Sequence, residues 1–177
     1  MKIKIIIMAV IILVISALFL STYSFPKAIN VVRDAVSFVE YDEKPATLTN
    51  VQVTGTLFRP LFKQHRFEGE IIIDGYEFTK QAIVVPILKH KNEVNYSQLI
   101  YFSEIKPYDP VAIASIYYDD KFERFTIVTR DEWIEKEPKS LYYIVSGNSY
   151  EEAFESQNIL SGKLGDNSFI APQNRLK

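Results

Sequence analysis

One stretch decides how this chain is organised: residues Ile5–Leu20 are IIIMAVIILVISALFL, in which Ser16 is the only polar side chain. A helix that continues from this stretch to Phe25 is ~31 Å long at ~1.5 Å per residue, which matches the hydrocarbon thickness of a bilayer. Each Ile, Leu or Val side chain gains about 1.5–3 kcal/mol on leaving water. The sequence therefore predicts a transmembrane helix, with the lipid bilayer as the partner of Ile5 to Phe25.

Two fates are open for this segment. Lys2 and Lys4 form a positive flank, which is typical both of a secretory signal and of an anchor whose N-terminus stays in the cytoplasm. Thr22 and Ser24 supply the small residues of a cleavage site, although aromatic residues adjoin them. The length of the apolar region favours the uncleaved anchor. We therefore expect a single-pass protein of the cell membrane with its domain outside the cytoplasm; the alternative is secretion after signal cleavage.

Composition bounds the rest of the chain. Its 177 residues leave room for one domain of ordinary size beyond the helix, large enough to bury a core without cross-links. Cysteine is absent, so disulfides, lipidation at cysteine and Cys-ligated metal sites are excluded. The net charge is −2, from 20 Lys and Arg against 22 Asp and Glu, so no basic field would attract nucleic acid.

The first quarter of the chain is expected to be helical. Residues 1–25 form the cytoplasmic stub and the transmembrane helix, and residues 26–50 are expected to form a juxtamembrane helix and a linker. The second helix is indicated by apolar residues that recur at spacings of three and four after Pro26. These residues are Ile29, Val32, Val36 and Val39.

Residues 51–162 change to the period of two that is typical of strands, and we count about six or seven strands joined by short connections. One helix follows, with a capping box at Ser149 and Glu152 and an end at Gly162. Residues 163–177 are expected to be a loosely ordered tail. The predicted class is α+β: an N-terminal transmembrane helix, then a mostly antiparallel β domain (a sheet, a barrel or a sandwich) with one C-terminal helix.

Two hairpins set the expected register of the strands. The Asp-Gly dipeptide at residues 74–75 favours a type I′ turn, which would pair Ile71 with Phe78. The second hairpin has an acidic turn and would set Ile116 opposite Phe125. Both pairings collect apolar side chains on one face, as the buried side of a sheet requires.

Four short pieces of the β region carry a resemblance. They are Val51-Gln52-Val53-Thr54-Gly55, Phe67-Glu68-Gly69, Ile73-Asp74-Gly75, and Tyr143-Ile144-Val145 followed by Glu152-Ala153. These pieces resemble short membrane-anchored proteins of unknown function from low-GC Gram-positive bacteria. The resemblance covers most of the β region and implies a compartment. It implies no activity and transfers no functional residue.

Residue types that carry chemistry are sparse. His65 and His90 lie in separate polar turns without the spacing of a metal motif, so two solvated loop residues are expected, with a metal pair formed by the fold as the alternative. The S-x-x-K pattern at residues 103–106 lacks the companion motifs of penicillin-binding enzymes. We therefore expect no catalytic residue, no cofactor and no metal site.

Two features are candidates for surface contact. The first is a basic and apolar stretch between two predicted strands, which suits anionic lipid heads or wall polymer. Its candidate contact residues are Arg59, Lys63, His65 and Arg66. The alternative is a polar loop whose flanking Phe58 and Phe67 belong to the core. The second feature is Trp133, the only tryptophan, which would stack on a sugar, anchor at an interface or cover the sheet.

The anchor, together with the lack of a catalytic constellation, predicts a single-pass membrane protein with an extracytoplasmic, β-rich binding or interaction domain rather than an enzyme. A membrane or envelope protein is the candidate partner. Two alternatives remain: a cell-envelope hydrolase that uses carboxylates near Trp133 or His65, and a small accessory or immunity subunit of a membrane complex.

Overall fold

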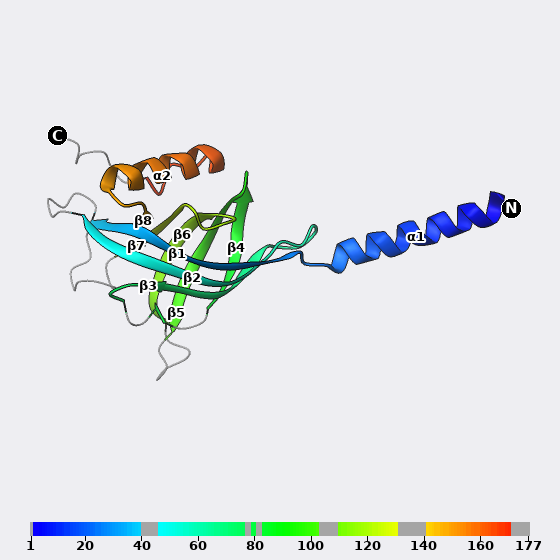
Figure 1. Cartoon of the computed structure of the whole chain (residues 1–177), viewed down its shortest axis with the longest axis horizontal. Helices are drawn as coiled ribbons and strands as arrows, with labels where there is room; N and C mark the ends of the chain where they lie inside the picture. The colour runs from blue at the N-terminus through cyan, green and yellow to red at the C-terminus, as the bar shows by residue number, and fades with distance from the viewer. Residues whose placement is uncertain are drawn as a thin grey trace.

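A computed structural model of the chain describes residues 2–39, 46–76, 79–80, 83–102, 110–130 and 141–170. Figure 1 shows a long N-terminal helix that leads into a β-barrel, with a second helix against the side of the barrel. The helices are α1 (Lys2–Thr22) and α2 (Tyr150–Leu164). The strands are β1 (Pro26–Val39), β2 (Thr47–Phe58), β3 (Arg66–Ile73), β4 (Ile83–Lys91), β5 (Val94–Phe102), β6 (Pro110–Asp119), β7 (Phe125–Arg130) and β8 (Leu141–Ser146).

Helix α1 stands away from the barrel. Within the described residues, Ile3–Thr22 is long and apolar enough to cross a membrane, with a mean hydropathy of 3.0, and none of that span is buried. A core helix of a globular domain would bury its apolar face, whereas α1 is apolar on all sides and exposed on all sides. The predicted N-terminal apolar helix is confirmed, and its surface is that of an anchor or a signal sequence.

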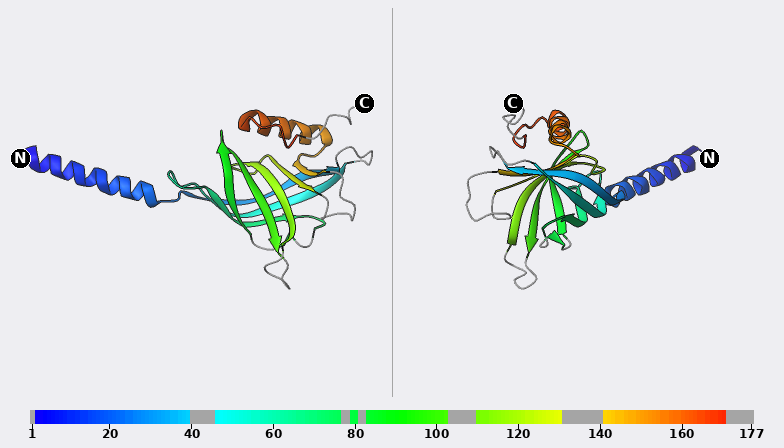
Figure 2. Two further views of the ribbon diagram at one scale, coloured as in Figure 1. Left: turned by 180° about the vertical axis from the view of Figure 1, so that it is seen from behind. Right: turned by 60° about the vertical axis from the view of Figure 1, so that its left-hand side comes forward.

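The eight strands form a closed antiparallel barrel in which each strand pairs with its neighbours in the chain (Figure 2). The barrel closes where the first strand meets the last, with Ala35 of β1 opposite Ser146 of β8. A barrel of eight strands has an interior just wide enough for side chains to fill. The predicted antiparallel β domain with one C-terminal helix is confirmed, and the barrel is the form it takes.

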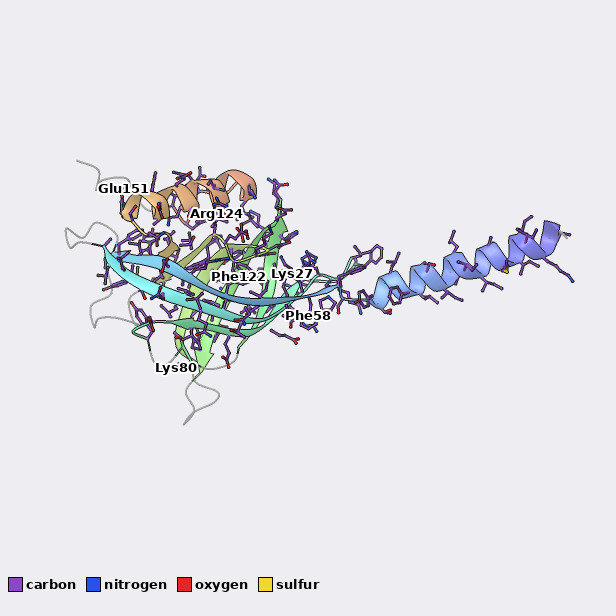
Figure 3. All side chains as sticks on the ribbon, in the orientation of Figure 1. Lys27, Phe58, Lys80, Phe122, Arg124 and Glu151 are labelled. Carbon is purple, nitrogen blue, oxygen red and sulfur yellow. The ribbon has the colours of Figure 1, made fainter. Side chains whose placement is uncertain are left out.

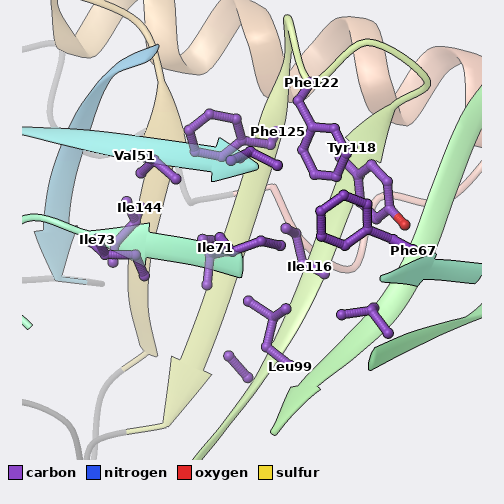
Figure 4. Packing of buried hydrophobic residues seen from close by; sticks show 14 of the residues in the cluster. Val51, Phe67, Ile71, Ile73, Leu99, Ile116, Tyr118, Phe122, Phe125 and Ile144 are labelled. Carbon is purple, nitrogen blue, oxygen red and sulfur yellow. The ribbon is translucent and has the colours of Figure 1, made fainter. Parts of the chain in front are cut away.

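Large apolar side chains fill the barrel. Figure 4 shows Phe67, Ile71, Leu99, Ile116, Tyr118, Phe122 and Phe125 pointing into the interior. They come from strands β3, β5, β6 and β7 and from the turn between β6 and β7. The hydroxyl of Tyr101, itself fully buried, donates a hydrogen bond of 2.8 Å to the carbonyl oxygen of Ile71, which satisfies both groups inside the core. The barrel is therefore a packed scaffold.

The predicted juxtamembrane helix is wrong, because Pro26–Val39 forms strand β1. Ile29 and Ala35 face the barrel interior, while Val36 and Phe38 face outward and pack under α2. Burial on both faces of one strand produces apolar residues at irregular spacings, and here those spacings imitate the period of a helix. The β domain therefore begins at Pro26, not at residue 51.

The first predicted hairpin is right about the position of its turn and wrong about the turn type and the partner strand. The backbone amide of Tyr76 donates to the carbonyl of Ile73 at 3.1 Å, as in a tight turn. Gly75 has a positive φ of 86° but Asp74 does not, so the turn is not of type I′. The strand that pairs with β3 is nevertheless β4, which sets Gly69 opposite Ile83. Phe78 lies outside the described residues.

The second predicted hairpin forms with a register shifted by two residues. Ile116 pairs with Ile127 instead of Phe125, because the turn is longer than expected. A shift of two keeps every side chain on its face of the sheet, so the apolar face was predicted correctly.

Helix α2 and the segment after it are more ordered than expected. The Ser149 hydroxyl accepts a hydrogen bond from the Glu152 amide at 3.3 Å, which confirms the cap, but the helix runs past Gly162 to end at Gly165, in the left-handed conformation. Phe169 is fully buried, and its ring lies 3.9 Å from that of Tyr117. The prediction of a loose tail is therefore wrong up to residue 170, and residues 171–177 lie outside the described residues.

Candidate functional site

Polar and charged side chains gather at the end of the barrel that adjoins α1, which we call the α1 end. The segment between β2 and β3 points toward the end of α1 in Figure 1, and the backbone amide of Arg59 donates to the carbonyl of Ser24 at 2.7 Å. Figure 3 labels Lys27 and Phe58 at this end. The short segment that follows α1 is thus tied to the β2–β3 loop by a hydrogen bond as well as to β1 by the chain.

The turn between β6 and β7 closes the barrel at this end. The carboxylate of Asp119 accepts hydrogen bonds from the amides of Lys121, Glu123 and Arg124 at 3.0, 2.9 and 3.1 Å, which holds the turn in one conformation. Phe122 adopts a positive φ of 52° within it and points inward. Its fully buried ring stacks on Tyr118 at 4.2 Å and therefore seals the apolar interior.

A polar layer lies over this seal, and Asp120 is at its centre. Its carboxylate accepts a hydrogen bond from the side-chain nitrogen Nδ2 of Asn95 at 2.8 Å and lies 3.7 Å from the guanidinium of Arg59. The ammonium of Lys27 donates to the backbone carbonyl of Asp120 at 2.7 Å. Arg59 thus meets the half-buried carboxylate of Asp120 and Lys27 meets its backbone carbonyl, so these two cations face one carboxylate and leave the layer positive.

The fold brings together two histidines that sequence analysis placed in separate turns. The ring centroids of His65 and His90 lie 4.7 Å apart. Nδ1 of His90 is 2.7 Å from the side-chain oxygen of Asn95. Because the side-chain nitrogen of Asn95 donates to Asp120, its side-chain oxygen accepts, and the network places a proton on His90 Nδ1. We call Lys27, Arg59, His65, His90, Asn95 and Asp120 the mouth cluster.

The electrostatics of the mouth cluster favour a neutral imidazole at His65. Burial lowers the pKa of His65 below its ordinary value of 6.5, and the neighbouring His90 and Arg59 lower this pKa further, against an opposing effect of Asp120. A pair of imidazoles can ligate a metal ion, but among the described residues no group of three or more His, Asp and Glu side chains is placed to hold one.

The predicted contact residues separate into three environments. Arg59 and His65 belong to the mouth cluster, whereas Lys63 is exposed in the loop. The guanidinium of Arg66 lies 4.3 Å over the ring of Phe58 and 2.5 Å from the carboxylate of Glu68. Trp133 lies outside the described residues.

The expected core position of Phe58 is wrong. Phe58 is half-buried on the outside of the barrel, and Leu57 is the residue that enters the core, together with Phe67 as predicted. At the end of β2, the sequence analysis therefore assigned the alternating side chains to the wrong face of the strand.

One signal in the sequence could have found the mouth cluster. Asn95 is two, four and six positions away from residues 97, 99 and 101 of the same strand, so it shares the inward face with Leu99 and Tyr101. This spacing alone indicates a polar group inside the barrel.

An open pocket of about 420 Å³ lies between α2 and the barrel. Its charged lining residues have both signs: Arg33, Arg124, Asp34, Glu123, Glu152 and Glu155. The guanidinium of Arg33 donates to the carbonyl of Phe122 at 3.2 Å, so the pocket and the closing turn share a contact. With acidic groups in excess over basic ones, this pocket does not match an anionic ligand.

Comparison of the chain with protein-family models, with curated proteins and with solved structures found no match.

Proposed function

We propose that this chain is a single-pass membrane protein whose barrel is held outside the cytoplasm as a binding or interaction module. The observation that carries the proposal is the complete exposure of α1, an apolar helix long enough to span a bilayer. Only Tyr23–Phe25 separate it from β1. Stable exposure of so many apolar side chains requires a lipid phase around them.

The residues between α1 and β1 suit an uncleaved anchor. The ring of Tyr23 stacks on Phe19 at 5.1 Å and meets the edge of Phe25 at 4.8 Å. Aromatic clusters of this kind are enriched where a helix leaves the hydrocarbon, because their rings prefer the head-group region. The positive flank of Lys2 and Lys4 at the other end of the helix supports an orientation with the N-terminus inside.

The barrel supports binding through its ends rather than through its interior. Its inside is filled by side chains of the main core, so the scaffold is rigid and the loops present the exposed groups. The polar groups described above gather at the α1 end, close to the membrane that the anchor would occupy. A membrane or envelope protein, or the membrane itself, is the class of partner within reach of this end.

The topology and the fate of the helix can be tested in one experiment. We expect a C-terminal reporter after Lys177 to be active only outside the cytoplasm, and N- and C-terminal tags to stay on one polypeptide that resists alkaline extraction. Arginine at both Leu13 and Val14 should release the chain, since each costs about 2.5–3.5 kcal/mol at a helix centre. The matched control is Leu48→Arg at an exposed barrel position. A cytosolic reporter, or an extractable full-length chain, would refute the proposal.

A further inference from the structure

The loop that joins β2 and β3, residues 59–65, exposes two large apolar side chains at its tip. Leu61 is 57% exposed and Phe62 is 74% exposed. We call these residues the tip loop. Neighbouring exposed apolar side chains in a loop mark a surface that meets a partner or a membrane.

Both stems of the tip loop are fixed to the barrel. Pro60 is buried, and the side-chain amide of Gln64 donates to the carbonyl of Ile87 at 3.0 Å. Arg59, at the start of the loop, donates its backbone amide to Ser24 at 2.7 Å. The tip is therefore held in place relative to the barrel and to the residues that follow α1.

The position of Ser24 sets the depth of the tip loop in a membrane. A helix of this length spans the hydrocarbon at about 1.5 Å per residue, so the residues directly after Thr22 lie at the head-group level. Arg59 is hydrogen-bonded to one of those residues, and the tip loop extends toward the end of α1 in Figure 1. Leu61 and Phe62 consequently lie at the same level as the head groups.

The charges around the tip loop match an anionic surface. Arg66 is paired with Glu68, and Arg59 with Asp120. Lys27 and Lys63 remain in excess over these acids, and Lys63 is exposed next to Phe62. Apolar side chains flanked by lysine are the usual composition of a segment that enters a leaflet with anionic lipids.

We propose that the tip loop inserts into the leaflet through which α1 leaves the membrane, with Leu61 and Phe62 among the head groups and Lys63 beside anionic lipid phosphates. The barrel then stands on the membrane with the mouth cluster facing it. This inference rests on the proposed function, because it requires α1 to span the bilayer.

The absence of cysteine allows one spin label to be placed at each position of the full-length chain. The variants Val14→Cys, Phe62→Cys and Leu48→Cys are labelled with a nitroxide in vesicles of phosphatidylcholine and phosphatidylglycerol. Collision with oxygen and with a water-soluble nickel complex reports depth. We expect the Val14 label in the hydrocarbon, the Phe62 label in the head-group region, and the Leu48 label in water. Leu48 is the matched control, since it is 67% exposed at the opposite end of β2.

The three labels separate the two proposals. A Val14 label in water refutes the spanning helix. If the Val14 label is in the hydrocarbon but the Phe62 label is as accessible to the nickel complex as the Leu48 label, only the inserted loop is overturned. Shielding of the Phe62 label by soluble dextran sulfate, but not by the vesicles, also overturns it and indicates a polymer ligand. In vesicles of phosphatidylcholine alone we expect a shallower Phe62 label, and equal depth overturns the role given to anionic head groups.

Discussion

Replacing Phe122 by alanine should destabilise the barrel strongly, although the residue lies in a turn. Its ring is fully buried, stacks on Tyr118 at 4.2 Å and lies 5.3 Å from the ring of Phe67. Removal of a buried phenylalanine ring from a core costs about 3–5 kcal/mol, because the contacts are lost and a cavity remains. In a domain of this size, each kcal/mol lowers Tm by about 2–4 °C, so Tm should fall by roughly 6–20 °C.

The assay is thermal unfolding of the full-length chain in detergent, followed by near-ultraviolet circular dichroism, which reports the packing of aromatic residues in the barrel. Phe62→Ala is the matched control: Phe62 is 74% exposed, so its replacement should change stability by no more than about 0.5 kcal/mol. Phe122→Leu should lie between the two. If Phe122→Ala unfolds within 2 °C of the control, Phe122 does not seal the barrel.

Three further measurements test the packing, the mouth cluster and the helix cap. A methyl group at Gly55 would lie 2.7 Å from the Cα of Gly69, so Gly55→Ala should lower the free energy of unfolding by about 1–3 kcal/mol. Gly162 has open space around it, so Gly162→Ala should raise the free energy of unfolding by about 0.5–1 kcal/mol in the same assay. The pKa of His65 is lower in the folded chain than its ordinary 6.5, so its contribution to stability should be complete above pH 6.5 and be lost as the pH falls from there through the folded-state pKa. His65→Gln should flatten this pH dependence of the unfolding free energy. A pKa of His65 at or above 6.5 in an NMR titration would contradict the prediction. Ser149→Ala should lower the unfolding free energy by about 1 kcal/mol. The same change at half-buried Ser156, in the interior of α2, should not, and an equal effect of both would argue against the cap.

Sequence reasoning succeeded where a local pattern has one physical cause. The apolar run of α1 can be satisfied only by lipid or by burial, and the Ser149 cap depends on residues three positions apart. In these cases residues that are close together in the sequence determine the local structure.

Sequence reasoning failed where burial depends on contacts between elements that are far apart in the sequence. Val36 is buried because α2, from the end of the chain, covers the outside of β1, and no local pattern reports that contact. The same limit applies to the mouth cluster, since His65 and His90 meet only when β3 and β4 are paired. The closing turn adds a third case, because a phenylalanine between charged residues gives no sign that it points inward.

The pairing of β1 with β8 also constrains how the molecule can be made. The first strand to leave a ribosome or a translocation channel is the one that needs the last strand as its partner, so closure must await almost the entire chain. Until then β1 exposes an unsatisfied backbone edge, which is a site for aggregation. Tethering of the nascent chain by α1 would keep that edge apart from other copies while the remaining strands arrive, and slow, late closure is expected of such non-local contacts.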